Sequence, residues 1–567
     1  MNKIKDVNID YNFLEKKYFK KKNVKKINSE LQFHKKKYKF YIKELSSQFN
    51  YLLGKDYSHN FWNVTIGTFI FYHLHQCQEV YNTFDTIKEL DRKKSLKILN
   101  PYFFNTPSNL YNYQKFIQSS DIGRLQIFSI LIKKKFPKLK IIYDKKKYSH
   151  YNKKKNDTKR TKGIDLNFLF QRVINFFYRK IKNPSLLITG CYWNIKDNID
   201  IQYKSNGKIR VENFYINNED NINLDKKLRN EIFSSKKYTD SFDQFFFETL
   251  KYCCPKSLFE NLDFRINRTE DYLNKFKNIK YIINENLSED NLILLAISRN
   301  KNIKTIYCEH NTLRHPYLGD WTLFIKSLFD FYITLGWKNA NKSFFAGGSL
   351  FPAFRPLKNY SESINKKILF VSSLPIKRTL FHSSIYGEDS FNNNSYYKIN
   401  KLFFNNINQN VARKIIYKKY PNTSNFDLSC VENKIDKLVK IRTAKVIVNK
   451  NRITTEDLKN SKLIITNYIK TFYLQTLISN IPTVIFYNNE SYSLKSRHKN
   501  FFKELTDASI MHKNPQSAAK FVNVIYNDPY KWWNSKKTQE ARKKFLLSNI
   551  KSGDELKKLV LKFANKK

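Results

Sequence analysis

Residues 463–487 read LIITNYIKTFYLQTLISNIPTVIFY and carry the clearest structural pattern in the chain. The apolar runs Leu463–Asn467 and Thr483–Tyr487 each have the length and the branched side chains of a buried strand. Between these runs, the spacing predicts a helix that begins near Thr471 and ends before Pro482, which cannot continue a helix. A strand, a helix and a second strand in succession are typical of a parallel βαβ unit.

The same alternation of short apolar runs with helix-like segments recurs along most of the chain. It predicts two series of strands, one before residue 346 and one after residue 366. This pattern favours the α/β class, with two Rossmann-like domains that face a cleft. The runs of the first series are Leu186–Thr189, Tyr281–Asn284, Thr305–Cys308 and Phe331–Leu335. The other runs of the second series are Lys367–Ser372, Lys445–Val448 and Ser509–His512.

This pattern divides the chain into five segments. Residues 1–165 are rich in Lys and aromatic residues at helical spacing and are interpreted as an N-terminal helical extension. The first Rossmann-like domain is expected at 166–345 and the second at 367–528. Residues 346–366 contain two Gly and two Pro and are interpreted as the linker between them. Residues 529–567 are expected to form C-terminal helices that return to the first domain.

Composition limits the class of protein. Hydrophobic residues make up 41% of the 567 residues, so the chain has enough apolar material for sizeable cores. The six Cys form no CxxC pair and are interpreted as reduced thiols of a cytoplasmic protein. The start of the chain lacks the apolar run of a signal peptide. No stretch approaches the roughly 18 consecutive apolar residues of a membrane-spanning helix.

The chain is strongly basic. Lys and Arg number 103 against 49 Asp and Glu, which gives a net charge of +54. Such a charge is typical of proteins that bind nucleic acid or anionic membranes. Because Lys is spread through every segment, a bias of composition explains most of the excess, and some attraction to an anionic membrane remains. The run Lys145–Lys162 is interpreted as a mobile loop or linker, with nucleic-acid binding as the alternative.

Ligands of open parallel sheets bind beyond the carboxyl ends of the strands, so the residues that follow each strand are candidates for a site. Glu309 and His310 follow the run Thr305–Cys308. A neutral imidazole accepts a proton near pH 7, so His310 is a candidate general base, with Glu309 to assist or orient it. The alternative is a structural histidine in a loop.

Two further candidates lie in the second series. The predicted helix at Thr471 offers N–H groups and the positive end of its dipole to a diphosphate, with Lys470 beside it. Lys377 and Arg378 follow the run Lys367–Ser372, where cations and hydroxyls suit an anion, and Arg378 is expected to assist with donor phosphates. An ordinary helix cap and a solvated loop are the respective alternatives.

Several common catalytic motifs are absent from the sequence. There is no GxGxxG, no GxxxxGK[ST], no HExxH and no GxSxG. The dehydrogenase, P-loop, zincin and α/β-hydrolase classes therefore lose their usual support. No DxD metal signature is present either, so we expect neither a metal nor a cofactor.

The stretch Ile464–Ser548 resembles the C-terminal part of a group of bacterial surface-polysaccharide transferases. The resemblance is carried by TNYIKTFYLQTLISNIPTVIFYN and by HKNPQSAAKFVNVIYNDPYKWWNSKKTQEARKKF. Phe61–Gln76, the Glu309-His310 segment and Tyr332–Trp337 are similar to other parts of the same family. That family resembles GT-B enzymes, including the CDP-glycerol glycerophosphotransferases and the capsule polysaccharide transferases.

The resemblance implies a transferase that moves a sugar or polyol-phosphate unit from a nucleotide-activated donor to a glycan or lipid-linked acceptor. It implies a cytoplasmic protein, peripheral on the inner face of the plasma membrane, with an acceptor-side first domain and a donor-side second domain. The donor pattern of the family falls on Asn467, Lys470, Thr471 and Gln475, of which only Thr471 keeps the family's residue type. A non-catalytic GT-B homologue and a basic nucleic-acid-binding protein are the alternatives, although no specific nucleic-acid partner is expected.

Overall fold

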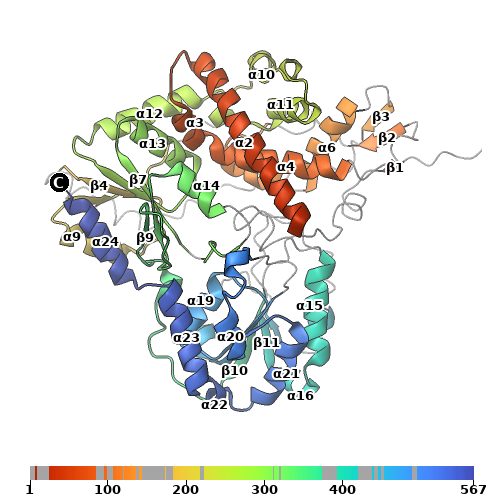
Figure 1. Cartoon of the computed structure of the whole chain (residues 1–567), viewed down its shortest axis with the longest axis vertical. Coiled ribbons are helices and arrows are strands. Elements are labelled where there is room, and N and C mark those ends of the chain that lie inside the picture. Colours follow the sequence, from red (N-terminus) through yellow and green to blue (C-terminus); the bar gives the residue numbers. More distant parts are fainter. Residues whose placement is uncertain are drawn as a thin grey trace, which may run out of the picture. The chain divides into compact units, whose positions relative to one another are not determined.

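The computed structural model of the chain consists of two compact units (Figure 1). The N-terminal unit contains residues 1–183, 212–278 and 286–303, and the two-sheet unit contains residues 184–211, 279–285 and 304–567. Lys145–Lys162 and Arg378 lie outside the described residues. The structure describes residues 7–8, 24–84, 95–98, 106–118, 121–135, 140–143, 173, 183–216, 222–310, 312–317, 321–372, 393–418, 437–439, 445–447, 453–487 and 494–566.

The first sheet of the two-sheet unit has six parallel strands in the order β5-β4-β6-β7-β8-β9. Its inner strands are buried along nearly their whole length, which explains why they read as continuous apolar runs. The strands are β4 (Leu186–Thr189), β5 (Ile209–Val211), β6 (Tyr281–Asn284), β7 (Lys304–Cys308), β8 (Phe331–Thr334) and β9 (Phe344–Ala346).

The second sheet also has six parallel strands, in the order β12-β11-β10-β13-β14-β15. This is the 3-2-1-4-5-6 order of a doubly wound Rossmann sheet. The predicted βαβ unit is formed by β13, α19 (Thr471–Ile478) and β14. The strands are β10 (Lys367–Val371), β11 (Ile415–Lys418), β12 (Lys445–Ile447), β13 (Ser461–Thr466), β14 (Thr483–Phe486) and β15 (Met511–His512).

The predicted fold class is confirmed: the chain is α/β, with two parallel sheets in a GT-B-like arrangement. The bounds of β4 and β6 are those that the sequence predicts. Three strands of these two sheets, β5, β9 and β11, are not predicted by the apolar runs. The C-terminal helices expected over residues 529–567 begin with α22 (Pro529–Trp533) and α23 (Lys536–Asn549), which are separate because Ser535 accepts from the Thr538 N–H and caps a new helix.

The core of the first sheet combines its strands with the end of the chain. Ile188, Ile283 and Ile333, from three strands, are fully buried in one cluster with Leu556 and Val560 of α24 (Gly553–Asn565). The prediction that the last helices return to the first sheet is therefore confirmed for α24.

The other long helix of this C-terminal segment, α23, packs instead against elements of the second sheet, which differs from the prediction. The Phe545 ring lies 6.4 Å from Tyr473 and 5.5 Å from Phe501, both of which follow strands of the second sheet. The Leu547 side chain is 82% exposed, so it needs no partner surface. The second sheet has a separate core, to which Leu369, Ile464 and Ile481 contribute.

The segment that connects α23 to α24 lies against glycines in the loops of the first sheet. Lys551 donates its N–H to the Leu335 carbonyl at 2.8 Å, and Ile550 forms an antiparallel bridge with Gly336. Gly348 has a φ of +96°, and a Cβ there would lie 2.4 Å from the Ser552 carbonyl oxygen. Gly348, expected in a linker, thus allows close contact with this crossing segment, while the adjacent Gly347 allows close contact with Leu559 of α24.

The remaining helices of the two-sheet unit connect the strands and cover the sheets. They include η5, a short 3₁₀ helix between the last strand of one sheet and the first strand of the other. These helices are α9 (Ile195–Lys204), α14 (Trp321–Leu328), η5 (Pro352–Phe354), α15 (Asn393–Asn406), α16 (Gln409–Ala412), α18 (Thr455–Lys459), η6 (Ser496–His498), α20 (Lys503–Asp507) and α21 (Pro515–Ile525). Asn514 caps α21, whose first residue is Pro515.

The N-terminal unit is mainly helical, with one small parallel sheet in the order β1-β2-β3. The segment Phe61–Gln76, similar to an opening helix of the family, is divided between α3 and α4. The elements are β1 (Val7–Asn8), α2 (Val24–Leu53), α3 (His59–Thr65), α4 (Gly67–Phe84), β2 (Ser95–Ile98), α5 (Leu110–Tyr113), the π-helix η2 (Gln114–Gln118), α6 (Asp121–Lys135), β3 (Lys140–Tyr143), α10 (Lys226–Ile232), η3 (Ser235–Lys237), α11 (Ser241–Cys253), η4 (Lys256–Leu258), α12 (Leu262–Asn274) and α13 (Glu289–Asn300).

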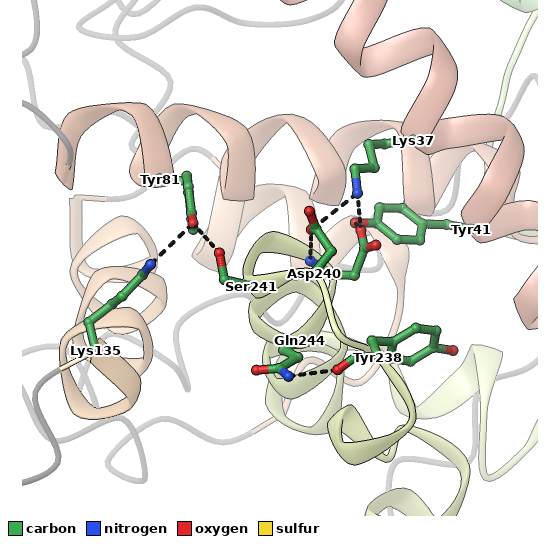
Figure 2. A network of polar contacts seen from close by, with 9 residues as sticks. Lys37, Tyr41, Tyr81, Lys135, Tyr238, Asp240, Ser241 and Gln244 are labelled. Atoms are coloured by element: carbon green, nitrogen blue, oxygen red, sulfur yellow. Dashed lines mark hydrogen bonds and ion pairs between the residues drawn. The ribbon is translucent and has the colours of Figure 1, made fainter.

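Polar contacts join the helices of the N-terminal unit that are far apart in the sequence (Figure 2). Lys37 of α2 donates to Asp240 at 3.2 Å and to Asp243 at 2.5 Å, at the start of α11. The Tyr41 hydroxyl donates to Asp243 at 2.6 Å, and its ring stacks on Phe246 at 3.9 Å. An ionic contact and a stacked pair thus fix α2 against α11.

Of the helices that the structure describes, none is long and apolar enough to cross a membrane.

Candidate functional site

The order of strands in each sheet changes direction at one pair of neighbours, and ligands of doubly wound sheets bind beyond the carboxyl ends of that pair. In the first sheet the pair is β4 and β6, where the Asn284 amide donates to the Thr189 carbonyl at 2.9 Å. In the second sheet the pair is β10 and β13, where the Asn467 amide donates to the Ser372 hydroxyl at 3.3 Å. One Asn therefore ties the strands together at each switch point.

Glu285 follows β6 at the switch point of the first sheet. Its Oε1 accepts from the Trp193 indole N–H at 2.6 Å, and its Oε2 accepts from the Tyr192 backbone N–H at 2.8 Å. Burial raises the pKa of the Glu285 carboxyl to about 7, although these hydrogen bonds lower it. Glu285 thus fixes the loop that follows β4.

Glu309, a predicted site residue, follows β7 and is held in a similar way. Its Oε2 accepts from the Trp337 indole N–H at 2.7 Å and from the Leu335 backbone N–H at 3.1 Å. Its Oε1 is buried and makes no hydrogen bond to the described residues. Burial raises the pKa of this carboxyl to about 7. The observed contacts tie the end of β7 to the residues after β8.

His310 is half-buried between two aromatic side chains. Its ring centroid lies 4.9 Å from that of Tyr192 and 6.3 Å from that of Phe351. Its Nδ1 is buried and has no hydrogen-bond partner among the residues described. Burial, together with the smaller effect of the Arg314 charge, lowers the pKa of His310 to about 3. The ring is therefore neutral at cellular pH, but it is a weaker base than the unperturbed histidine assumed from the sequence.

His315 is placed differently from His310. Its ring stacks on Trp337 at 4.3 Å and lies 5.3 Å from the ring of His498. Lys495 donates from Nζ to the His315 carbonyl at 3.2 Å. Among the described residues, no aromatic ring contacts both His310 and His315. Residues 312–317, after β7, thus contact residues 494–498, which follow the second sheet's β14.

The helix α19 follows β13 at the switch point of the second sheet. It begins at Thr471, as its sequence predicts, and Lys470 occupies the N-cap position without a side-chain capping bond. Thr471 and Gln475 are half-buried, whereas the intervening Phe472–Leu474 are buried. The i, i+4 spacing thus places the two polar side chains on the more exposed face of the helix.

Asn467 has two structural partners for its buried amide nitrogen. Its Nδ2 donates to the Asn400 Oδ1 at 3.1 Å as well as to the Ser372 hydroxyl. The side chain is fully buried. These bonds connect β13 to β10 and to α15, so they account for an amide at this position without a ligand.

A direct connection runs from the surroundings of His310 to α19. Phe351, which contacts the His310 ring, immediately precedes η5, and η5 packs against α19. A few residues later, the Leu357 N–H donates to the hydroxyl of Ser479, the C-cap residue of α19, at 3.2 Å. The segment between the two sheets thus brings the neighbours of His310 to the candidate donor helix.

Four residues near these sites are missed by reasoning from the sequence: Tyr192, Glu285, Arg314 and Phe351. Glu285 directly follows a predicted strand, so the rule that identifies Glu309 also applies to it. Tyr192 and Phe351 lack such a signal, because these two aromatic residues become neighbours only through the fold. Within the described ranges, no group of three His, Cys, Asp or Glu side chains is arranged to hold a metal ion.

Comparisons with solved structures detect similarity at low identity. UDP-GlcNAc 2-epimerase from Neisseria meningitidis, bound to UDP-GlcNAc, is 8% identical with a TM-score of 0.35, over 66% of this chain and 98% of that one. An OtsA apo structure is 8% identical with a TM-score of 0.38, over 67% and 99%. Trehalose 6-phosphate synthase from Burkholderia multivorans is 8% identical with a TM-score of 0.35, over 68% and 98%. At these TM-scores the likeness carries no conclusion about activity.

Similarity in sequence is more specific. No curated protein matches the chain. A family profile described as LIC12162 family transferase matches residues 9–563, which is nearly the whole chain and includes both sheets and both candidate sites. The chain therefore belongs to the LIC12162 family of transferases.

Proposed function

We propose that this transferase moves a sugar or polyol-phosphate unit from a nucleotide-activated donor to a hydroxyl of a glycan or lipid-linked acceptor. The observation that carries the proposal is the contact of η5 with α19. Phe351, at the start of η5, touches the ring of His310. A candidate base and a candidate phosphate-binding helix are therefore connected by a few residues of one segment. In this proposal, 166–345 is the acceptor-side domain, 367–528 is the donor-side domain, and 346–366 links them.

The donor diphosphate is proposed to bind at the N-terminus of α19. The first N–H groups of a helix lack partners within the helix, and the dipole favours negative charge there. Lys470 supplies a cation at the N-cap, and Thr471 supplies a hydroxyl. Gln475, on the same face of the helix, is proposed to hydrogen-bond a hydroxyl of the donor. Arg378 is proposed as a second cation for the phosphates.

His310 is proposed to accept the proton of the acceptor hydroxyl. The acceptor oxygen forms a bond to the donor's reacting carbon or phosphorus, and the bond to the leaving nucleotide breaks. The pKa of about 3 in the free protein would make this proton transfer inefficient. A bound diphosphate adds negative charge, which favours the protonated imidazole and raises its pKa. The base would thus become effective only when the donor is present.

A thermal-shift screen tests the donor side of this proposal. CMP, CDP, UDP and GDP, with their sugar or polyol conjugates, are each added to the full-length protein. Stabilisation by one nucleotide and its conjugate, followed by turnover of that conjugate with a membrane extract as the acceptor source, would support the proposal. Binding without turnover would favour a non-catalytic homologue, and stabilisation by none of these compounds would contradict a nucleotide-activated donor.

A further inference from the structure

We propose that Tyr192, His310 and Phe351 form an aromatic platform on which a sugar ring of the acceptor rests. The three side chains come from the loop after β4, the end of β7 and the segment before η5. The platform thus lies beyond the carboxyl end of β4, which is one strand of the first sheet's switch point. The inference rests on the proposed transferase function and names the class of acceptor for that site: a saccharide rather than a simple polyol or lipid.

The platform presents an aromatic surface to solvent. The Tyr192 side chain is 47% exposed, although its ring contacts both of the other members. The ring centroid of Phe351 lies 6.5 Å from that of Tyr192, with the rings nearly perpendicular at 86°. Large aromatic side chains are usually buried more completely than Tyr192. An exposed tyrosine in contact with a candidate base is therefore well placed to meet a substrate.

The platform is also held in position by buried groups. Glu285 accepts from the Tyr192 backbone N–H at 2.8 Å and from the indole of the next residue, Trp193, at 2.6 Å. The Phe351 backbone N–H donates to the Ser349 hydroxyl at 3.1 Å. A loop that served only as a connection would not need a buried carboxylate to fix it. A binding surface gains from such fixation, because less conformational freedom is lost when the ligand binds.

The chemistry of the platform suits a saccharide. One face of a pyranose ring carries C–H groups and stacks on an aromatic face, while its hydroxyls point outward from the ring edge. An aromatic ring beside a polar group can satisfy both parts of such a ligand. The half-buried imidazole of His310 adds a ring with a polar nitrogen to this aromatic surface. A sugar stacked on Tyr192 would thus present a hydroxyl close to the proposed base.

A nucleobase also stacks on aromatic rings, so it is the main rival occupant. We assign the nucleotide to the second sheet because α19 supplies a helix N-terminus and Lys470 there. The platform belongs to the first sheet. Among the described residues there, Arg314 is the one cation whose charge lowers the pKa of His310. The two assignments predict different effects of the same substitution.

The test uses full-length protein with three variants, Tyr192→Ala, Tyr192→Phe and Tyr203→Ala. Tyr203, at the end of α9, is 73% exposed and serves as the matched control. Maltotriose and chitotriose are titrated by calorimetry in the presence of the nucleotide that stabilises the protein, and that nucleotide is titrated separately. We expect at least one trisaccharide to bind. Tyr192→Ala should weaken this binding about tenfold, as loss of a stacked ring typically does, whereas the other two variants should change it less than threefold.

Each outcome of this test has a defined meaning. The platform is contradicted if neither trisaccharide binds the parent protein, or if Tyr192→Ala binds it as tightly as the parent does. A loss of nucleotide affinity in Tyr192→Ala would instead assign the platform to the nucleobase and overturn the proposal. If the parent binds a trisaccharide but no nucleotide, the platform stands and the proposed donor chemistry fails. A thermal midpoint within about 2 °C of the parent excludes unfolding of the variants as the cause.

Discussion

Two buried glutamates follow neighbouring strands of the first sheet, and each accepts from an indole N–H and a backbone N–H. Burial raises the pKa of Glu285 and of Glu309 from an ordinary value of 4.5 to about 7. Between pH 4.5 and 7, each carboxyl is therefore protonated in the folded protein and ionised in the unfolded chain. This difference stabilises the folded protein. The stabilisation is fully present below pH 4.5 and is lost as pH rises through 7.

Substitution of Glu309 by Gln should remove half of this pH dependence. Oε2 accepts both hydrogen bonds of Glu309, so a Gln oxygen in its place keeps both while the charge is absent. One pKa unit corresponds to about 1.4 kcal/mol, so each carboxyl accounts for up to about 3 kcal/mol between pH 4.5 and pH 8. Thermal midpoints measured across this range should fall less in Glu309→Gln than in the parent. Equal falls in the two proteins would show that the Glu309 carboxyl does not titrate in this window.

Substitution of His310 by Ala tests the role of the ring directly. A general base typically contributes 10²–10⁴-fold to a rate, so turnover of the donor identified by the nucleotide screen should fall by about that factor. Affinity for the nucleotide should change little, because the proposed donor site lies on the second sheet. His59→Ala, at an exposed position of α3, serves as the control. Full turnover in His310→Ala would make His310 a structural residue.

At the scale of single elements, α19 is the helix on which the proposed donor binding depends. Thr471→Ala removes a hydroxyl from its first turn and Lys470→Ala removes the N-cap cation, while the helix keeps its buried face of Phe472–Leu474. Each change should weaken nucleotide binding by on the order of 1 kcal/mol, or about fivefold. Calorimetry with the stabilising nucleotide measures this effect. Lys531→Ala, an exposed lysine of α22, should bind as the parent does, and parental affinity in both α19 variants would move the donor elsewhere.

The crossing segment between α23 and α24 depends on the glycine at 348. Gly348→Ala places a Cβ 2.4 Å from the Ser552 carbonyl oxygen at a φ of +96°, so we expect a loss of about 2 kcal/mol or more in unfolding free energy. Gly54→Ala is the matched control, because Gly54 also has a positive φ, of +59°, but has open space at the Cβ position. Urea unfolding compares the two variants. A loss at Gly348 no larger than the loss at Gly54 would mean that the contact with Ser552 is unimportant.

Elements differ in how well the sequence predicts them, for physical reasons. The inner strands β4 and β6 are buried on both faces, so their apolar runs mark their bounds. The strands that are missed are short or interrupted by polar side chains: β5 contains Arg210, and β11 ends at Lys418. Arg210 lies at the edge of the sheet in β5, where pairing with β4 rather than a long apolar run determines the strand.

The residues of the candidate site likewise differ in how well the sequence predicts them. Glu309, His310 and Thr471 are found because each lies at the end of a predicted strand or at the start of a predicted helix. The pairing of Tyr192 with Glu285 joins residues 93 positions apart, and it depends on β4 and β6 being neighbours in the sheet. The sequence contains no pattern that specifies this strand order. The low pKa of His310 likewise depends on burial and on Arg314, which periodicity does not reveal.

At the scale of the two-sheet unit, each sheet has its own core, and among the described residues α24 contributes to the core of the first sheet. Leu556, Val560 and Phe563 of α24 are spaced at i, i+4 and i+7, so they lie on one face of the helix and are buried against the first sheet. Lys557, on the same helix, contacts Asp197 at 2.9 Å and Asp200 at 2.6 Å. The core of the second sheet contains no residue of α24.

Deletion of residues 553–567 should therefore affect the two sheets unequally. The deletion exposes Ile188, Ile283 and Ile333 of the first sheet, and burial of each such side chain contributes about 1.5–3 kcal/mol. Hydrogen exchange at the amides of β4, β6 and β8 should accelerate, whereas the amides of β13 and β14 should keep their protection and nucleotide should still bind. Removal of Lys566 and Lys567 alone, which leaves α24 intact, is the control. Uniform acceleration in both sheets would show that they unfold together, and unchanged exchange in the first sheet would show that α24 is dispensable for its core.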